Sequence, residues 1–243
     1  NQLTPLGEEV VRRARRIIHE ASELKESTQY LLEGGGKIRI GLGSGPASLL
    51  TKSLLSYTAN KHPLAKIQIV RGTTELQVGQ LRSHLLDVLI VDSRRVLPAA
   101  DLNIEHISEL KANFICSKHH PLAKKKNIPF DDLLDYPIAS SPLSEEVSRL
   151  LVHQYGPKAN PSEMLSLQCE DIHAIIQSLE DTPIIFIGIT SAAQNLIDQG
   201  KLVELHLKSP MQSGAKFALV TLEGATPPPF LAELKKEIIT LLT

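Results

Sequence analysis

Residues 37–50, KIRIGLGSGPASLL, join a short apolar strand pattern to a turn rich in glycine and serine and then to the start of a helix. Apolar residues alternate up to Leu42, and leucines recur at helical spacing after Pro46, a residue suited to the first position of a helix. Such a helix directs its unpaired N–H groups and its positive dipole end at whatever lies beyond the strand. The stretch therefore predicts a small-anion site beside Ser44, and the alternative is a strand-to-helix connection without a ligand.

Two further turns repeat this arrangement with hydroxyl side chains. Thr74 follows a second alternating strand and pairs with Gln77 in a capping-box pattern, which predicts a helix start. Ser141 stands before a proline, ahead of a helix expected over residues 143–155, and is a candidate N-cap. Helix capping alone explains each hydroxyl, so the anion-binding prediction depends on the group rather than on any one member.

Other kinds of chemistry find little support in the sequence. The glycine turn lacks the third glycine of the dinucleotide fingerprint, and residues 38–74 contain no Asp or Glu to hold a ribose. No nucleophile pairs with a base, and the nine histidines show no metal-ligand spacing. Cys116 and Cys169 have no partner at short spacing, so we expect reduced thiols without a redox role. We therefore expect no catalytic residue, metal or cofactor.

The order of predicted elements indicates an α/β fold. Residues 37–92 alternate strand, helix, strand, helix and strand, and they end in DVLIVD, a continuous apolar run typical of a parallel strand buried on both faces. Ligands of such a sheet are expected beyond the carboxyl ends of its strands. Further strands are expected at residues 112–117, 164–169, 184–189 and 217–222, and a final amphipathic helix at residues 230–242.

The composition is typical of a globular protein in a reducing cytoplasm. The chain is 42% hydrophobic and 22% charged, and its net charge of -1 provides no overall basic field to attract nucleic acid. No apolar run reaches the roughly 18 residues of a membrane span, and no signal peptide is recognisable. The chain begins at Asn1 rather than at methionine, which indicates a processed protein or a fragment.

Residues 6–33 predict one long helix with a coiled-coil seam. Apolar or small residues recur at alternating spacings of four and three, and charged residues flank them. We expect dimerisation through this seam, because a triple glycine at residues 34–36 separates the helix from the following strand; a helix folded back on its own domain is the alternative. The seam consists of Val10, Ala14, Ile17, Ala21, Leu24, Thr28 and Leu31.

Several short motifs, taken in order, resemble the LysR-type transcriptional regulators. They are LTPLG before the long helix, KIRIG at the first strand, DVLI, HPLA followed by DL and YP, and GKLV near the end. The resemblance covers essentially the whole chain, although residues 181–183 and 188–190 depart from the family's pattern. It implies an α/β fold of the type 2 periplasmic-binding-protein class, in which two Rossmann-like subdomains follow a long linker helix.

The resemblance also implies a domain organisation and a binding site. Residues 1–36 would form the dimerisation helix, residues 37–114 with 217–243 the first regulatory subdomain, and residues 115–216 the second. A small effector would bind in the cleft between the subdomains, and hydroxyls beside helix N-termini suit a small carboxylate. Mapped onto this sequence, the effector-binding residues are Ser44, Ser48, Thr73, Thr74, Ser141, Ser144, Gln168 and Cys169.

The function implied is that of the effector-sensing and oligomerisation region of a transcription regulator, without catalytic activity. The family would act as a homodimer or homotetramer and would bind DNA through an N-terminal winged helix-turn-helix, which this sequence lacks. The alternative is a free-standing solute-binding protein of a transport system, which has the same fold. The long heptad helix favours the regulator, because a transport protein has no need of one.

Overall fold

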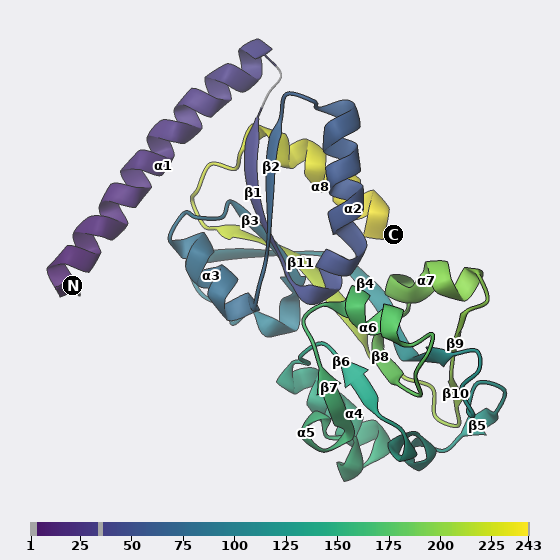
Figure 1. Cartoon of the computed structure of the whole chain (residues 1–243). Coiled ribbons are helices and arrows are strands. Elements are labelled where there is room, and N and C mark those ends of the chain that lie inside the picture. The colour runs from purple at the N-terminus through teal and green to yellow at the C-terminus, as the bar shows by residue number, and fades with distance from the viewer. Residues whose placement is uncertain (1–3, 34–35, 243) are drawn as a thin grey trace. The chain divides into compact units, whose positions relative to one another are not determined.

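The computed structural model describes residues 4–33 and 36–242 of the chain, apart from some side chains of the first helix, and it divides into two compact units. Unit 1 comprises residues 1–107 and 218–243, and unit 2 comprises residues 108–217. Figure 1 labels the elements. In chain order they are α1 (Pro5–Glu33), β1 (Lys37–Leu42), α2 (Ser44–Lys61), β2 (Lys66–Arg71), α3 (Thr74–Arg82), β3 (Val88–Asp92), η1 (Ser93–Arg95), β4 (Leu102–Ser117), β5 (Lys126–Ile128), η2 (Phe130–Asp135), β6 (Ile138–Ser140), α4 (Glu145–Tyr155), η3 (Pro157–Ala159), α5 (Pro161–Met164), β7 (Leu165–Gln168), α6 (Ile172–Ser178), β8 (Ile185–Ile189), α7 (Thr190–Asp198), β9 (Leu202–Glu204), β10 (His206–Leu207), β11 (Gly214–Leu222) and α8 (Pro229–Leu242).

Unit 1 contains a sheet with the strand order β2-β1-β3-β11-β4, in which β2, β1 and β3 are parallel. The side chains of Ile38, Ile40 and Leu42 are fully buried on one face of β1, and Gly41 lies on the other face against α3. Figure 1 shows α2 and α8 on one side of this sheet and α3 on the other. Alternate residues of β1 thus contact the helices on the two opposite faces of the sheet.

Unit 2 divides a run of apolar residues between two cores. Its sheet has the order β4-β8-β6-β7, with β9 also paired to β4. Ile185 and Ile187 of β8 belong to the core beneath α4, whereas Phe186 between them belongs to the core of α6 and α7. Burial on both faces explains why β8 reads as the continuous apolar run IFIGI.

Helix α1 begins at a cap and carries exposed apolar side chains. The N–H of Gly7 donates to the hydroxyl of Thr4 at 3.1 Å, so the helix starts at Pro5, as the threonine-proline pair favours. The side chains of Val10, Ile17 and Leu24 are 57%, 66% and 73% exposed. The side chain of Leu31, the last predicted seam position, lies outside the described part of the chain.

Two helix starts in unit 1 differ from the sequence-based expectation. Helix α2 begins at Ser44, two residues before Pro46, and its N-cap is Gly43. Helix α3 does begin at Thr74, but its N-cap is Thr73, whose hydroxyl accepts from the N–H of Leu76 at 3.4 Å. The capping box expected for Thr74 was wrong because the side chain of its partner is bonded to the ends of two strands instead.

In unit 2, helix α4 also begins later than the sequence predicted. Its N-cap is Ser144 rather than Ser141, and the Ser144 hydroxyl accepts from the N–H of Val147 at 3.3 Å. Glu145 and Glu146 then occupy the first turn, where the positive end of the helix dipole stabilises their carboxylates. The strand expected at residues 112–117 is the end of a longer one, β4, which starts in unit 1. Among the described helices, none has both the length and the apolar character needed to cross a bilayer.

A largely buried ion pair fastens β1 to the start of β3 within unit 1. The backbone N–H and the Nε of Arg39 both donate to Oδ2 of Asp87, at 2.6 and 3.2 Å, and a further guanidinium nitrogen reaches Oδ1. The same guanidinium donates to the carbonyl of His84 at 2.8 Å. Only 4% of the Asp87 side chain is exposed, so removal of either partner leaves a charge without its hydrogen bonds.

We expect Asp87→Ala to lower the free energy of unfolding by roughly 2 to 4 kcal/mol, because the buried guanidinium loses its carboxylate. Urea unfolding followed by circular dichroism measures the change. The matched control is Asp101→Ala, which breaks the pair with Arg82, whose side chains are 46% and 51% exposed. Solvent screens that pair, so its loss costs much less. Equal destabilisation by the two variants would contradict the importance of the Arg39–Asp87 pair.

A buried histidine in unit 2 is held in one neutral form. Nδ1 of His120 accepts from the N–H of Leu122 at 3.1 Å, so Nε2 carries the proton that it donates to the carbonyl of Pro183 at 3.2 Å. The residue is 5% exposed, and its ring packs edge-on against Tyr136. Burial lowers the pKa of His120, and the bond to the Pro183 carbonyl opposes part of that change.

Because the folded-state pKa of His120 lies below the unfolded value of about 6.5, its contribution to stability is complete above that pH and is lost as the pH falls toward the folded-state pKa. We expect His120→Asn, whose Oδ1 can still accept from Leu122, to flatten the pH dependence of unfolding between pH 7 and 5. The change is at most about 1.4 kcal/mol per pH unit, the value for one proton. The exposed neighbour His119, changed to Asn, is the control, and an identical pH profile of the two variants would refute the assignment.

Candidate functional site

The turn after β1 presents a helix N-terminus at the carboxyl edge of the sheet of unit 1. Gly43 donates its N–H to the carbonyl of Ile90 in β3 at 3.0 Å, which fixes the turn between two strands. Ser44, the first residue of α2, is 9% exposed. The hydroxyl of Ser48 donates to the carbonyl of Gly45 at 2.7 Å and is thus already used within the helix. The backbone N–H groups at the start of α2 are therefore better placed than the Ser48 hydroxyl to receive an anion.

The turn after β2 adds a second helix N-terminus at the same edge, because β1 and β2 are parallel neighbours. Thr73 is exposed and caps α3. Thr74 is 2% exposed and is the first residue of α3. A threonine at a helix N-terminus can offer both its hydroxyl and its backbone N–H to an anion. Thr74 is for this reason the strongest of the predicted binding residues in unit 1.

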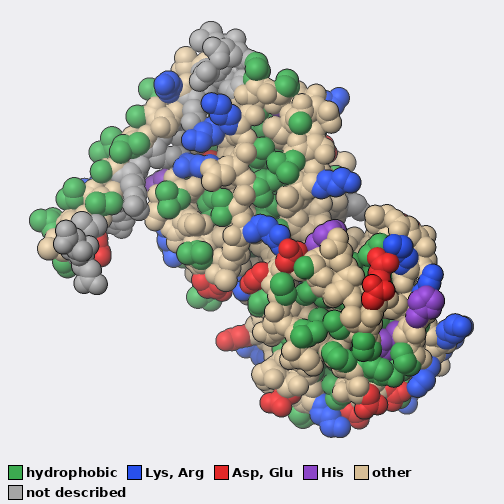
Figure 2. Space-filling view, viewed as in Figure 1, with side chains coloured by type: hydrophobic (Ala, Val, Ile, Leu, Met, Phe, Trp, Pro, Cys, Tyr) green, Lys and Arg blue, Asp and Glu red, His purple; other side chains and the backbone are tan. Residues whose placement is uncertain are grey.

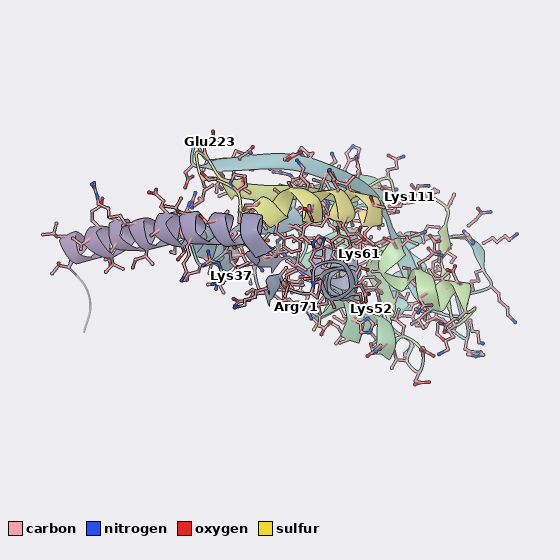
Figure 3. All side chains as sticks on the ribbon, turned by 90° about the horizontal axis from the view of Figure 1, so that it is seen from above. Lys37, Lys52, Lys61, Arg71, Lys111 and Glu223 are labelled. Atoms are coloured by element: carbon pink, nitrogen blue, oxygen red, sulfur yellow. The ribbon has the colours of Figure 1, made fainter. Side chains whose placement is uncertain are left out.

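Cationic side chains at this edge were missed by the sequence analysis. Arg71 is the last residue of β2, in register with Leu42 at the end of β1, and Figure 3 labels it near α2. Arg95 follows β3, and its guanidinium lies 4.0 Å from the carboxylate of Glu75. Arg94 is 6% exposed and bonded to Asp92 at 2.6 Å. The signal in the sequence was the pair of arginines that follows the run VLIVD after one serine.

In unit 2, the predicted serines after β6 have different roles. Ser140, the last residue of β6, donates its hydroxyl to the carbonyl of Ile187 at 2.8 Å and holds β6 to β8. Ser144 caps α4 and is 9% exposed. Ser141 is half-buried, and its side chain has no partner among the described residues. Ser141 and, as a donor, the capping Ser144 therefore have hydrogen-bonding capacity that the fold does not use.

The neighbouring strands β7 and β8 end at the same edge of unit 2 as β6, because the three are parallel. Gln168 is exposed, and so is Cys169, whose sulfur accepts from the N–H of Asp171 at 3.3 Å. Thr190, the first residue of α7, was not predicted, yet its buried hydroxyl has no partner among the described residues. The feature of the sequence that could have identified Thr190 is a hydroxyl residue directly after the apolar run IFIGI.

These edges can bind a small molecule, but they hold no evident reactive group. Burial raises the pKa of the Cys116 thiol to about 12, which keeps it protonated and unreactive. Within residues 4–33 and 36–242, no three metal-ligating side chains cluster together. What each unit offers is a row of hydroxyls, backbone N–H groups and helix N-termini at the carboxyl ends of its parallel strands.

The solved structures with a similar fold are regulatory proteins. HinK, a LysR family transcriptional regulator from Pseudomonas aeruginosa, superposes with a TM-score of 0.66 at 18% identity, over 100% of this chain and 83% of that one. The regulatory domain of OxyR2 from Vibrio vulnificus gives 0.66 at 18% identity, over 86% and 96% of the two chains. The effector binding domain of QuiR in complex with shikimate gives 0.59 at 17%, over 84% and 95%. At these identities the likeness shows the fold alone.

Curated relatives are transcription regulators. A probable nitrogen assimilation transcriptional activator from Synechocystis is 27% identical over 74% of this chain and 59% of its own length. The transcriptional dual regulator GltC of Bacillus subtilis is 24% identical over 72% and 58%. The chain thus spans little more than half the length of these relatives.

A family model described as LysR substrate binding domain matches residues 33–241, which is most of the 243 residues. The predicted resemblance and the predicted fold class are thereby confirmed. The chain belongs to this family, and it is an effector-binding regulatory domain of the LysR type rather than an enzyme.

Proposed function

We propose that the chain senses a small anionic metabolite, a carboxylate in particular, through the turns at the carboxyl ends of its parallel strands. The observation that carries this proposal is the position of Thr74, which is 2% exposed and begins α3 just beyond the end of β2. Ser44 begins a second helix at the neighbouring strand end. Two helix N-termini side by side favour a negative charge.

Three features support an anion over a neutral ligand. The segment that builds these turns, residues 34–74, contains six of the 26 basic residues and none of the 27 acidic ones. Arg71 and Arg95 lie at the ends of β2 and β3 in the same unit. Serine and threonine hydroxyls with backbone N–H groups are suitable donors for a carboxylate.

The predicted set in unit 2 would complete the site, with Ser141, Ser144, Gln168 and Cys169 as contacts from the second subdomain. The placement of the effector in a cleft between the subdomains, and the domain limits expected at residues 36, 114 and 216, remain proposals. A free-standing solute-binding protein is the less favoured alternative, because the curated relatives are transcription regulators.

We also propose that α1 is the dimerisation helix and that the protein acts as a homodimer or homotetramer. The exposed stripe of Val10, Ile17 and Leu24 on a 29-residue helix supports this proposal, because large apolar side chains in a row mark an interaction surface. Figure 2 shows hydrophobic side chains exposed along α1. DNA binding would reside in a further domain, as the names of the regulatory relatives imply.

The ligand proposal is tested by a thermal-shift screen against acetate, 2-oxoglutarate, shikimate and amino acids. A ligand at 100 times its dissociation constant adds about 2.7 kcal/mol, which raises the Tm by several degrees. For any carboxylate that binds, we expect Thr74→Val with Ser44→Ala to weaken affinity about 10- to 100-fold, the value of a charge-assisted hydrogen bond.

The control is Thr51→Val, because the Thr51 hydroxyl donates to the carbonyl of Ala47 at 2.7 Å within α2. This variant has the same change of side chain away from the strand ends, so its affinity should equal that of the wild type. Equal affinities of the double variant and the control would show that the site lies elsewhere.

The dimerisation proposal predicts that Leu24→Asp places a charge in the apolar stripe and raises the dissociation constant of the oligomer at least tenfold. Sedimentation velocity over a range of concentrations measures it. Ser22→Asp adds the same charge at an exposed position off the stripe and should leave the oligomer intact. If Leu24→Asp sediments as the wild type does, α1 is not the dimerisation helix.

A further inference from the structure

Gln77 is a fully buried amide that joins two strands of unit 1 to helix α3. It is 0% exposed and lies in the first turn of the helix. Its Nε2 donates to the carbonyl of Leu42 at 3.1 Å and to the carbonyl of Val70 at 3.1 Å. These two carbonyls belong to the ends of β1 and β2, which are parallel neighbours.

The orientation of the amide follows from its partners. Two carbonyl oxygens accept and cannot donate, so the NH2 group faces both of them. The opposite atom, Oε1, is buried and has no hydrogen-bond partner among the described residues. The unpaired Oε1 costs free energy, because a buried acceptor has lost its hydrogen bonds to water. In return, two donors lie at the strand ends, and a buried group left unpaired in this way needs an explanation.

The backbone of β1 is adapted to this side chain. A Cβ atom on Gly41 would lie 3.2 Å from Cδ of Gln77 and 2.6 Å from Cδ2 of Leu89. Glycine at this position lets the amide lie against the strand and reach the carbonyl of the next residue, Leu42. The hydrogen bonds of Gln77 thus continue the pairing of β1 and β2 at the point where both strands end.

The two strand ends joined by Gln77 lead directly into the two candidate binding turns. Gly43 follows Leu42 and opens the turn with Ser44, and Thr73 follows β2 by two residues and caps α3. We propose that Gln77 is a positioning residue, which holds these two turns at one spacing so that their N–H groups and hydroxyls converge on one ligand. The assignment of a ligand to the turns rests on the proposed function, but the clamp itself is a property of the unliganded chain.

Hydrogen exchange of the unliganded protein tests the clamp. Two reporter amides lie in the turns: Gly43 donates to the carbonyl of Ile90, and Gln77 itself donates its backbone N–H to the carbonyl of Thr73, both at 3.0 Å. We expect Gln77→Met, which keeps the volume but has no donor, to lower the protection of both amides at least tenfold. Protection in α8 should stay unchanged. The control is Gln80→Met, the same exchange at a half-buried position of α3.

A second variant separates loss of the donors from loss of packing. Gln77→Glu has nearly the same shape, and burial against two carbonyls raises the pKa of the introduced carboxyl. At pH 5 the protonated carboxyl can donate to one carbonyl, whereas at pH 8 the carboxylate repels both. Relative to wild type at the same pH, we expect near-normal protection at pH 5 and at least tenfold lower protection at pH 8. A side chain with a packing role alone would give no such pH dependence.

The outcomes divide clearly. Protection within twofold of wild type in Gln77→Met, or equal relative protection of Gln77→Glu at both pH values, overturns the clamp. If the clamp holds, Gln77→Met should also bind shikimate or 2-oxoglutarate at least tenfold more weakly, provided that the wild type binds either. A wild type that binds no carboxylate while the exchange results hold would overturn the proposed ligand and leave the clamp standing.

Discussion

The parallel pairing of β1 with β2 on one side and β3 on the other is the constraint on which unit 1 depends. Parallel neighbours must end at the same edge of the sheet, so the turns that follow them are adjacent although they are far apart in the chain. The Arg39–Asp87 pair holds β3 in place near the opposite end of β1. Gln77 acts at the other end, where it bonds to β1 and β2. The geometry of the proposed binding edge thus follows from backbone pairing and from two side chains that reinforce it.

Unit 2 also brings the ends of parallel strands to one edge of a sheet, but it distributes its apolar side chains differently. Its strands β8, β6 and β7 are also parallel, and the residue after each carries a hydroxyl or a thiol. Alternate residues of β8 enter separate cores, so both faces of the sheet are covered by helices. His120, neutral and bonded at both ring nitrogens, fastens a turn of this unit to the carbonyl of Pro183. Stability here depends on burial, whereas several polar groups stand at the strand ends where we propose that the effector binds.

The hydroxyls of the candidate site differ in how much of their hydrogen-bonding capacity the fold already uses. Ser48 and Ser140 donate to carbonyls of their own unit. Thr73 and Ser144 act as helix caps. Thr74, by contrast, is 2% exposed and is the first residue of α3 rather than its cap. A capping hydroxyl accepts one N–H and can still donate to a ligand, so structural and binding roles are compatible at these positions.

The sequence by itself determined the α/β class, the order of the main elements, the long first helix and the LysR-type family, because strand and helix periods and local motifs are written in neighbouring residues. It did not reveal that Thr73 and Ser144 are the caps, that Ser140 is used by Ile187, or that Thr190 is buried without a partner in the described chain. Only the structure decided these points, because the caps depend on the residue at which each helix begins, and the partner of Ser140 depends on which strand lies beside which. Gln77 shows the reason most directly: from the sequence it is a capping partner three residues away, whereas its amide bonds to carbonyls 7 and 35 residues away, on strands that sheet pairing brings together.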